Sequence, residues 1–408
     1  MIMDILEAKN LVIKAGLELL DAGLIVRTWG NISCRISNTQ FVITPSGKAY
    51  DILTPDDIVV VNISDLSYEG NVKPSSEKGI HASCYQLRPD VNFVIHTHQK
   101  NASAVSCLGL DVTDIDGDEA EVLGNSVPCA AYGLPGQPKL REGVVEAIKR
   151  STSKAAIMKH HGAVCMGESY EEAKKVALAL EDACEKFIVK RARKISARDI
   201  ENFNGVADYI NSVFTSYEKY TKATEFKICN SNRKGKVIYI AEEGKEAAIF
   251  NAKTGEWVGG ADIPDGADLH LDIYKARKDV NCIRHTKNPF VLTMSRKGKT
   301  MLPLLDDFAQ LCGTMVNCGT FNPNSTLFSS KKVIAALGTN NVVLLKDNGA
   351  LCVAGNEYDA DAVCMVLEKD CQATIGAQLY DKIKPISQVD ATLMRVIYKM
   401  KYSKQSGK

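Results

Sequence analysis

Three histidines form the most chemically specific pattern in this sequence. His96 and His98 stand two residues apart in NFVIHTH, whose apolar residues predict a strand. Side chains at positions i and i+2 of a strand point to one face, so both imidazoles face one pocket. His161 lies in KHHG, where the apolar strand pattern AAIM meets a turn. Imidazole nitrogens grouped in this way are typical ligands of zinc and related divalent ions.

Three short polar loops precede the histidines and offer a place for an anion. They contain Gly30 and Asn31 in TWGNIS, Ser46 and Gly47 in VITPSGKAY, and Ser75, Ser76 and Glu77 in VKPSSEKGIH. Small hydroxyls and backbone N–H groups at a helix start can cradle a phosphate without lysine or arginine. Each loop taken singly is more often a turn or a helix cap.

The chain repeats itself, which predicts two copies of one domain. Residues 80–98 (IHASCYQLRPDVNFVIHTH) match residues 269–287 (LHLDIYKARKDVNCIRHTK). Residues 155–183 match residues 342–370 at nearly the same offset. Two matches in the same order indicate a tandem duplication.

The repeat tests the metal interpretation from inside the chain. An H-x-H pair on a strand is often only half-buried and hydrogen-bonded to the backbone. If the histidines served packing alone, both copies would need them about equally. In the second copy only His285 remains, whereas Lys287 and Asn348 replace the other two histidines and Gly266 replaces the glutamate of PSSE. The polar loops are absent as well, so pocket and ligands disappear together.

The elements that would position these residues alternate between strands and helices. QFVIT, IVVVN, FVIHTH and AAIMKH have strand patterns, whereas 5–23, 77–88, 139–150 and 169–194 have helical periodicity. This mixture predicts an α/β sandwich, with a central sheet flanked by helices. A domain boundary is expected near 205–235, where the periodicity is lost.

Bulk composition narrows the class of partner. Fifty basic residues face 49 acidic ones, for a formal net charge of +1, which favours neither nucleic acid nor an anionic membrane. The basic stretch from Lys186 to Arg198 is interpreted as the solvated end of a helix. No apolar run approaches bilayer-spanning length, and the thirteen cysteines have no disulfide-framework spacing. We therefore expect a cytoplasmic protein with reduced cysteines.

In this order, the motifs GNIS, TPSG, PSSE-x3-H, RPD, HTH and HHG resemble those of the class II aldolase and adducin superfamily, above all its L-fuculose-phosphate aldolase branch. The resemblance covers 5–195 well and 235–375 in part. It implies a class II aldolase-type α/β/α sandwich with a central, mainly antiparallel sheet, in two tandem copies. The domains expected are 1–215, catalytic, 230–385, degenerate and without the metal ligands, and a C-terminal tail over 386–408.

The resemblance also implies roles for single residues. In that family the H-x-H histidines, here His96 and His98, and the histidine before glycine, here His161, bind a divalent ion, usually zinc. The glutamate of PSSE, here Glu77, transfers protons and can also coordinate the ion. The loops that hold the substrate phosphate match Gly30, Asn31, Ser46, Gly47, Ser75 and Ser76. The expected cofactor is a divalent metal, zinc first, with manganese or cobalt as alternatives.

The implied reaction is cleavage of a ketose 1-phosphate to dihydroxyacetone phosphate and an aldehyde. A Lewis-acidic ion would stabilise the enediolate, and Glu77 would move the proton. Glutamate at this position favours an aldolase over the family's ribulose-phosphate 4-epimerases, which carry PSSD. An epimerase or dehydratase acting on a phosphorylated sugar is the alternative. A non-catalytic adducin-like scaffold is a third, disfavoured because the first copy keeps its histidines and Glu77.

The sequence departs from the family at two points. Fuculose-phosphate aldolases place a tyrosine from a neighbouring subunit where 111–129 here is acidic and has none. Candidates for the family's C-terminal tyrosine are Tyr217, Tyr220, Tyr380, Tyr398 and Tyr402. The second departure is the degenerate copy. Since family active sites lie between subunits of a four-fold tetramer, we expect a homo-oligomer: a dimer of fused chains that reproduces the ring, or a tetramer. The expected ligand is a small phosphorylated sugar, with no nucleic acid or membrane partner.

Overall fold

The computed structural model describes residues 3–25, 27–195, 229–321 and 326–401. Its contacts divide the chain into two compact units. The first falls within Met1–Val206 and includes Ala373–Lys384, and the second falls within Ala207–Gln372 and includes Pro385–Ser406. The predicted junction between 215 and 230 lies almost wholly outside the described residues, as do Tyr217, Tyr220 and Tyr402.

The first unit is built on a seven-stranded sheet in the order β3-β2-β1-β4-β7-β6-β5. Its strands are β1 (Asn31–Arg35), β2 (Gln40–Ile43), β3 (Val59–Asn62), β4 (Phe93–Thr97), β5 (Cys129–Ala130), β6 (Ala155–Met158) and β7 (Gly162–Gly167). All neighbours pair antiparallel except β5 and β6. The mainly antiparallel sheet predicted from the sequence is therefore confirmed.

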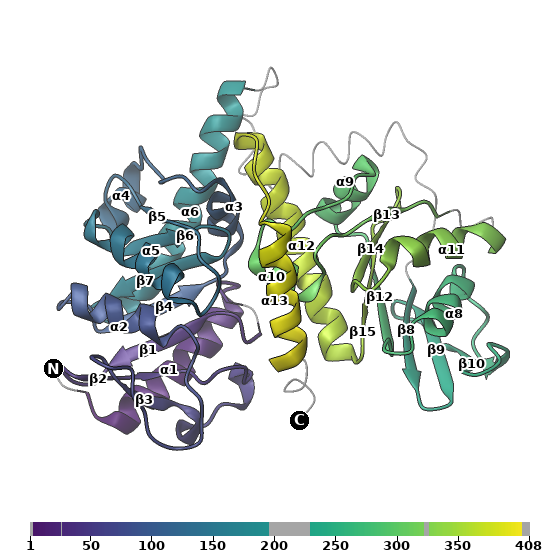
Figure 1. The fold of residues 1–408 in the computed structure, drawn as a ribbon, viewed down its shortest axis with the longest axis horizontal. Coiled ribbons are helices and arrows are strands. Elements are labelled where there is room, and N and C mark those ends of the chain that lie inside the picture. Colours follow the sequence, from purple (N-terminus) through teal and green to yellow (C-terminus); the bar gives the residue numbers. More distant parts are fainter. Residues whose placement is uncertain (1–2, 26, 196–228, 322–325, 402–408) are drawn as a thin grey trace. The chain divides into compact units, whose positions relative to one another are not determined.

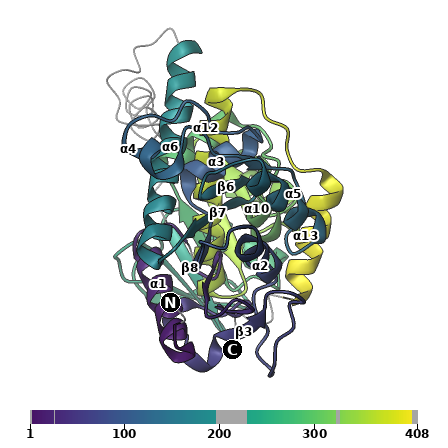
Figure 2. The same cartoon turned by 90° about the vertical axis from the view of Figure 1, so that its left-hand side faces the viewer.

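Helices cover both faces of this sheet. Helix α1 (Ile5–Asp21) contacts β1 and β2, and α6 (Tyr170–Ile195) contacts β4, β6 and β7. On the other face, α2 (Lys78–Leu87) and α5 (Pro138–Lys149) pack together over the strands. Figure 1 labels these elements, and Figure 2 places α1 and α6 to one side of β6 and β7 and α2 and α5 to the other. The smaller helices α3 (Lys100–Leu108) and α4 (Gly117–Leu123) pack against α6.

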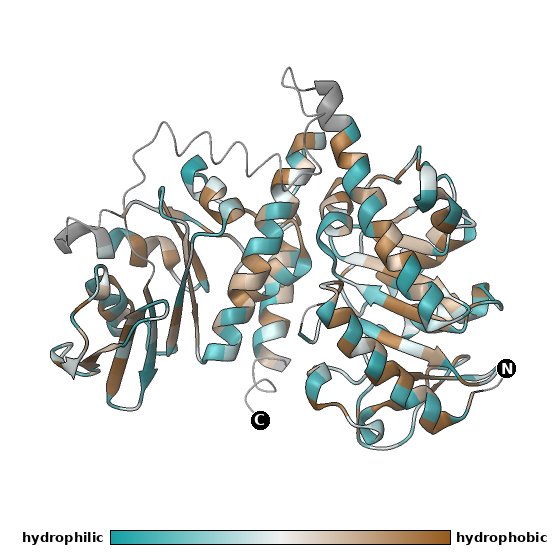
Figure 3. Cartoon of the chain, turned by 180° about the vertical axis from the view of Figure 1, so that it is seen from behind, coloured by the Kyte–Doolittle hydropathy of each residue, from teal (hydrophilic) through white to brown (hydrophobic). Residues whose placement is uncertain are grey.

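Alternation along the strands produces these two packed faces. Phe41 and Ile43 of β2 lie in the core beneath α2 and α5, together with Val94 of β4. Val42, which lies between the two β2 residues, and Ile95, which follows Val94, are also fully buried but lie outside that cluster. Since strand side chains alternate, both faces of the sheet are apolar and each needs a helical cover. Figure 3 shows the helices carrying both hydrophobic and hydrophilic residues, as this arrangement requires.

The second unit repeats the strand order and adds one edge strand. Its sheet has the order β11-β10-β9-β8-β12-β15-β14-β13. The strands are β8 (Cys229–Lys234), β9 (Val237–Glu242), β10 (Ala248–Asn251), β11 (Trp257–Gly260), β12 (Cys282–Thr286), β13 (Cys318–Gly319), β14 (Val342–Leu345) and β15 (Ala350–Ala354). The one parallel pair is again at the end of the sheet, between β13 and β14. The predicted tandem copies are confirmed.

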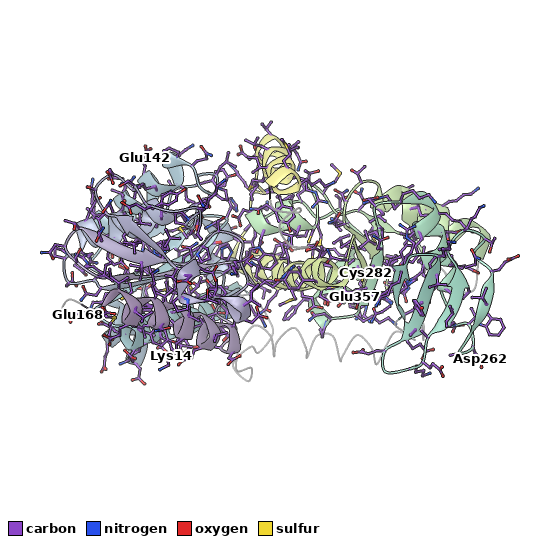
Figure 4. The ribbon with its side chains drawn as sticks, turned by 90° about the horizontal axis from the view of Figure 1, so that it is seen from below. Lys14, Glu142, Glu168, Asp262, Cys282 and Glu357 are labelled. Atoms are coloured by element: carbon purple, nitrogen blue, oxygen red, sulfur yellow. The ribbon has the colours of Figure 1, made fainter. Side chains whose placement is uncertain are left out.

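The helices of the second unit are α8 (Ala267–Ala276), α9 (Pro289–Lys297), α10 (Asp306–Leu311), α11 (Thr326–Leu337) and α13 (Gln388–Lys401), together with the part of α12 (Glu357–Tyr380) that precedes Ala373. Figure 4 labels Glu357, where α12 begins, and Cys282, where β12 begins; Arg284 of that strand forms an ion pair with Glu357 over 3.3 Å. Most of the segment expected as a tail forms α13, which is anchored where Arg395 donates to the carbonyl of Leu311 over 2.7 Å. Within the described ranges, no helix has the length and apolar character needed to cross a membrane.

Each strand and helix predicted for the first copy is present at its place in the chain. Sequence patterns missed β1 and β7. Strand β1 has the polar sequence NISCR and β7 the small-residue sequence GAVCMG, so neither alternates in the manner of a half-buried strand. Both are central strands of the sheet, and pairing with their neighbours stabilises them where local pattern does not.

Candidate active site

The sheet order brings the three histidines together. His96 lies on β4, and His98 follows the end of that strand. His161 lies in the tight turn between β6 and β7, where Met158 pairs with Gly162. Because β7 pairs with β4, that turn returns to the end of β4. The ligand atoms of the three histidines all lie within 4.8 Å of one another, and all three residues are buried.

Glycine is required directly after His161. A Cβ at position 162 would overlap the backbone carbonyl of Thr97, which pairs across the strands, and would lie 3.2 Å from the ring of His96. The turn is also tight, because His160 has φ of 61°. The HHG motif therefore combines a candidate metal ligand, His161, with a turn residue in the left-handed region, His160, and the only residue type that fits against β4, Gly162.

The Glu77 carboxylate lies against two of these histidines. Glu77 stands directly before α2, with Oε1 3.0 Å from His161 Nε2 and Oε2 3.4 Å from His96 Nε2. Burial raises the pKa of the Glu77 carboxyl, but the facing His161 and His96 and the hydrogen bonds from His161 and Asn31 outweigh burial and hold that pKa well below its usual range. Glu77 is ionised at neutral pH.

These residues fit a divalent metal ion. His96 Nε2 and His98 Nε2 are only 2.9 Å apart, with the Glu77 carboxylate beside them. His96 Nδ1 donates to the carbonyl of Ala163 over 2.9 Å, which leaves Nε2 as the lone-pair atom facing the centre. Imidazole nitrogens with one carboxylate are a donor set that zinc and related ions accept. Within the described residues, His96, His98 and His161 are the only group of three or more His, Cys, Asp or Glu residues close enough to hold a metal.

Two of the predicted anion loops lie side by side at the start of α2. Pro45 and Pro74 form a β-bridge, Ser46 N donates to Lys73 O over 2.9 Å, and Ser75 N donates to Thr44 O over 3.0 Å. Gly47 and Ser76 are exposed, whereas Ser75 is buried and its Oγ accepts from Glu77 N over 3.2 Å. Backbone hydrogen bonds thus hold the two loops together, and the loop of Ser75 and Ser76 directly precedes Glu77 in the chain.

The third loop contributes differently. Gly30 has φ of 99°, and a Cβ there would lie 2.7 Å from the backbone oxygen of His96, so the loop packs directly against β4. The Asn31 side chain is buried, and its Nδ2 donates to Glu77 Oε2 over 3.0 Å. Of the predicted anion-loop residues, these two are therefore tied to His96 and Glu77 rather than to the Ser46–Gly47 loop.

Two site residues were missed in the sequence. His81 contacts Asn31, and its repetition as His270 in the second copy was the available signal. Tyr132 lies edge-on to His160, with ring centroids 5.6 Å apart. It lies three residues beyond the acidic stretch 111–129, the stretch that matches the tyrosine region of the family.

The second unit has no comparable group among its described residues. His285, the match of His96, donates from Nε2 to the carbonyl of Asn348 over 2.7 Å. Gly266 stands directly before α8 with φ of 82°, as Glu77 stands before α2. The retained histidine therefore bonds to the backbone, as an H-x-H histidine without a metal would.

Comparison with known proteins agrees with this geometry. The Class II Aldolase and Adducin N-terminal domain matches residues 10–188 and 236–375. A 5-methylthioribulose-1-phosphate/5-deoxyribulose-1-phosphate aldolase of Escherichia coli O45:K1 (strain S88) is 39% identical over 155 residues, which cover 38% of this chain and 71% of that protein. L-fuculose phosphate aldolase of Escherichia coli (strain K12) is 38% identical over 162 residues, covering 40% of this chain and 74% of that protein.

Among solved structures, an L-fuculose 1-phosphate aldolase matches with a TM-score of 0.43 and 25% identity, and covers 52% of this chain and 95% of that one. The family domain matches both copies, and the two E. coli aldolases are each more than a third identical over much of their length. The chain therefore belongs to the class II aldolase and adducin family, as a tandem duplication with a degenerate second copy, and is an enzyme of the carbon–carbon lyase class.

Proposed function

We propose that the first unit cleaves a ketose 1-phosphate into dihydroxyacetone phosphate and an aldehyde in a metal-dependent reaction. The observation that carries this proposal is the convergence of three imidazoles and the ionised Glu77 carboxylate on one buried point. The names of the two E. coli relatives, both aldolases of five- or six-carbon sugar phosphates, support this substrate class.

In this proposal His96, His98 and His161 hold a divalent ion, zinc or else manganese or cobalt, and Glu77 can add an oxygen ligand. When bound, the ion would polarise the substrate carbonyl and stabilise the enediolate charge. The ring of His96 is held in one orientation by its bond to the Ala163 carbonyl, which keeps Nε2 directed at the site.

Glu77 is proposed as the group that moves protons. When the C3–C4 bond breaks, the C4 hydroxyl loses its proton and becomes the aldehyde oxygen, and the bonding electrons pass through C3 to the C2 oxygen. C3 then takes up a proton to give dihydroxyacetone phosphate. A buried, ionised carboxylate next to the ion can accept the first proton and return it to C3.

The substrate phosphate is proposed to bind at the paired loops before α2. Ser46, Gly47, Ser75 and Ser76 present hydroxyls and backbone near the N-terminus of that ten-residue helix, where the helix dipole favours negative charge. The family resemblance also implies Gly30 and Asn31 as residues of this phosphate site. We propose Gly30 as part of it.

Stretch 111–129 has no tyrosine, and Tyr132 beside His160 is proposed as the phenol that donates a hydrogen bond to the aldehyde oxygen as it forms. An epimerase or dehydratase using the same ion would not release dihydroxyacetone phosphate.

We also propose that the chain is a homo-oligomer, and that its thirteen unbonded cysteines reflect a reducing cytoplasm.

The direct test offers the purified full chain a panel of ketose 1-phosphates that includes fuculose, 5-deoxyribulose and 5-methylthioribulose 1-phosphates. Release of dihydroxyacetone phosphate is followed with and without EDTA. We expect release from at least one sugar, loss of activity with EDTA, and recovery on addition of zinc, manganese or cobalt. Conversion of a sugar phosphate without release of dihydroxyacetone phosphate would overturn the aldolase in favour of an epimerase or dehydratase.

A further inference from the structure

A line of hydrogen bonds joins Glu77 to the core of the first unit. Asn31 Nδ2 donates to Glu77 Oε2 over 3.0 Å, and Asn31 Oδ1 lies 2.5 Å from His81 Nε2. On the other side of the ring, His81 Nδ1 lies 2.6 Å from Ser33 Oγ, which lies 2.6 Å from Tyr85 OH. All five residues are buried. Solvent therefore does not compete for these bonds.

The fold places these side chains on one face of the sheet. Asn31 pairs directly with His96 across β1 and β4, and side chains opposite each other in an antiparallel pair share a face. Ser33 shares that face because it stands two residues further along β1. Helix α2 lies over it and presents His81 and Tyr85, four residues apart, on one side.

The chemistry of the groups gives each bond one direction. A carboxylate only accepts, so the amide group facing Glu77 is Nδ2, and Oδ1 of Asn31 faces His81. Oδ1 also only accepts, so His81 Nε2 carries a hydrogen. Burial is the main cause that lowers the pKa of His81, to about 3, so the ring is neutral and Nδ1 accepts from Ser33. Every donor in the line then points towards Glu77.

The second copy retains the inner half of this line. Ser231 Oγ lies 2.7 Å from His270 Nδ1 and 2.8 Å from Tyr274 OH. His270 is as deeply buried as His81, and burial lowers its pKa to about 3 as well. A serine, histidine and tyrosine in this arrangement therefore belong to the fold itself, since a copy without the metal group keeps them.

The second copy has lost the outer half. Cys229 stands two residues before its serine, where the first copy has Asn31, and its Sγ donates to the backbone oxygen of Asp265 over 3.2 Å. Gly266 stands where the first copy has Glu77. Asparagine is thus present where the glutamate is present and absent where the glutamate is absent.

We propose that Asn31 is a positioning residue for Glu77: its amide, held by His81, fixes the plane of the carboxylate so that Oε1 faces His161 and the reacting atoms. The inference rests on the proposed proton-transfer role of Glu77. It differs from the phosphate-binding role that the family resemblance implies for Asn31, and the two roles predict opposite kinetics.

The first test compares Asn31→Ala with the natural chain. A positioning role predicts that kcat falls about 10- to 100-fold, the usual effect of removing an outer hydrogen-bond partner, while KM stays within about two-fold. Inorganic phosphate, titrated by calorimetry into the metal-loaded protein without substrate, is expected to bind equally well to both. A rise in KM with unchanged kcat, or loss of phosphate binding, would overturn the proposal and assign Asn31 to the phosphate site.

The second test asks whether Asn31 acts through Glu77. Asn31→Ala is expected to lower kcat no further when Glu77→Gln is already present, because the carboxylate it orients is gone. Multiplicative losses in the double variant would overturn the positioning role while leaving Glu77 catalytic. Near-normal turnover of Glu77→Gln alone would instead remove the proposed function itself, so the two failures are distinguishable.

A third test uses the duplicated histidine as its matched control. His81→Leu removes the donor to Asn31 and is expected to lower kcat. His81→Gln keeps a donor and is expected to retain part of the kcat that His81→Leu loses. His270→Leu is the control, because it removes the equivalent histidine from the second copy. All three are compared below their unfolding temperatures. Equal losses of kcat in His81→Leu and His270→Leu would show a packing effect only and would overturn the proposal.

Discussion

His161 Nε2 lies 3.0 Å from Glu77 Oε1, although one residue belongs to the turn between β6 and β7 and the other precedes α2. The carboxylate also lies 3.4 Å from His96 Nε2, so it bridges two of the three histidines. Although burial raises the pKa of the Glu77 carboxyl, these two histidines and the Asn31 amide outweigh burial and hold that pKa below its usual range.

Replacing His98 with alanine is expected to abolish metal retention. Loss of a direct ligand should cost more than the roughly 10–100-fold in affinity that loss of an outer partner costs. Metal content after gel filtration, measured by atomic emission, checks this. His285→Ala provides the control, because His285 bonds to a backbone carbonyl and is expected to leave metal content unchanged. Equal metal loss in both variants would contradict the assignment.

Replacing Glu77 with glutamine is expected to preserve most of the bound metal and to lower kcat by about 10²–10⁴-fold, the range of general acid–base catalysis. The amide is nearly isosteric but does not accept and return a proton. Steady-state kinetics at saturating metal, with the metal content of each preparation measured, separates the two effects. A loss of activity fully explained by lost metal would make Glu77 a ligand and not a base.

Gly162→Ala and its match Gly349→Ala form a second matched pair. In each, the added Cβ would overlap a backbone carbonyl of the neighbouring strand, that of Thr97 or of Thr286. We expect each variant to lose about 1–3 kcal/mol of stability by overpacking, and Gly349→Ala to lose more because its φ of 78° is unfavourable for a residue with a Cβ. Only Gly162→Ala should also weaken metal binding, since it displaces the turn that carries His161. Thermal unfolding and metal titration of both variants provide the measurement.

Glu181 predicts a pH dependence of stability. Burial raises its pKa to about 7, although its carboxylate accepts from the N–H groups of Asn101 and Ala102 at the start of α3. The folded state therefore holds a proton that the unfolded state releases near pH 4.3, so this residue makes stability fall as pH rises from about 4 to 7, with no further change above. The stability of Glu181→Gln, measured by denaturant unfolding, should not show this fall between pH 4 and 7. The variant should therefore gain stability relative to the natural chain between pH 5 and 8. A pH-independent difference between the two would refute the assignment.

Several features of the site followed from sequence alone because they depend on local geometry. The two-residue spacing of His96 and His98 is enough to place both imidazoles on one face, since side chains alternate along any strand. The glycine after His161 predicted a turn at the end of the AAIM strand, and the structure has that turn between β6 and β7. The duplication is visible in the sequence because the two copies match each other. The loss of two histidines and the glutamate from the second copy indicated that these residues serve a metal site in the first copy and not packing.

The remaining features depend on contacts between distant segments, which only the tertiary structure determined. His161 reaches His96 because β7 pairs with β4, and no local pattern specifies which strands become neighbours. Asn31 was grouped with the phosphate loops by its motif, but the pairing of β1 with β4 turns its amide towards Glu77 and His81. Residue types and spacings thus determined which chemistry was possible. Strand pairing and helix packing, which depend on cooperative burial of the whole core, decided which side chains meet.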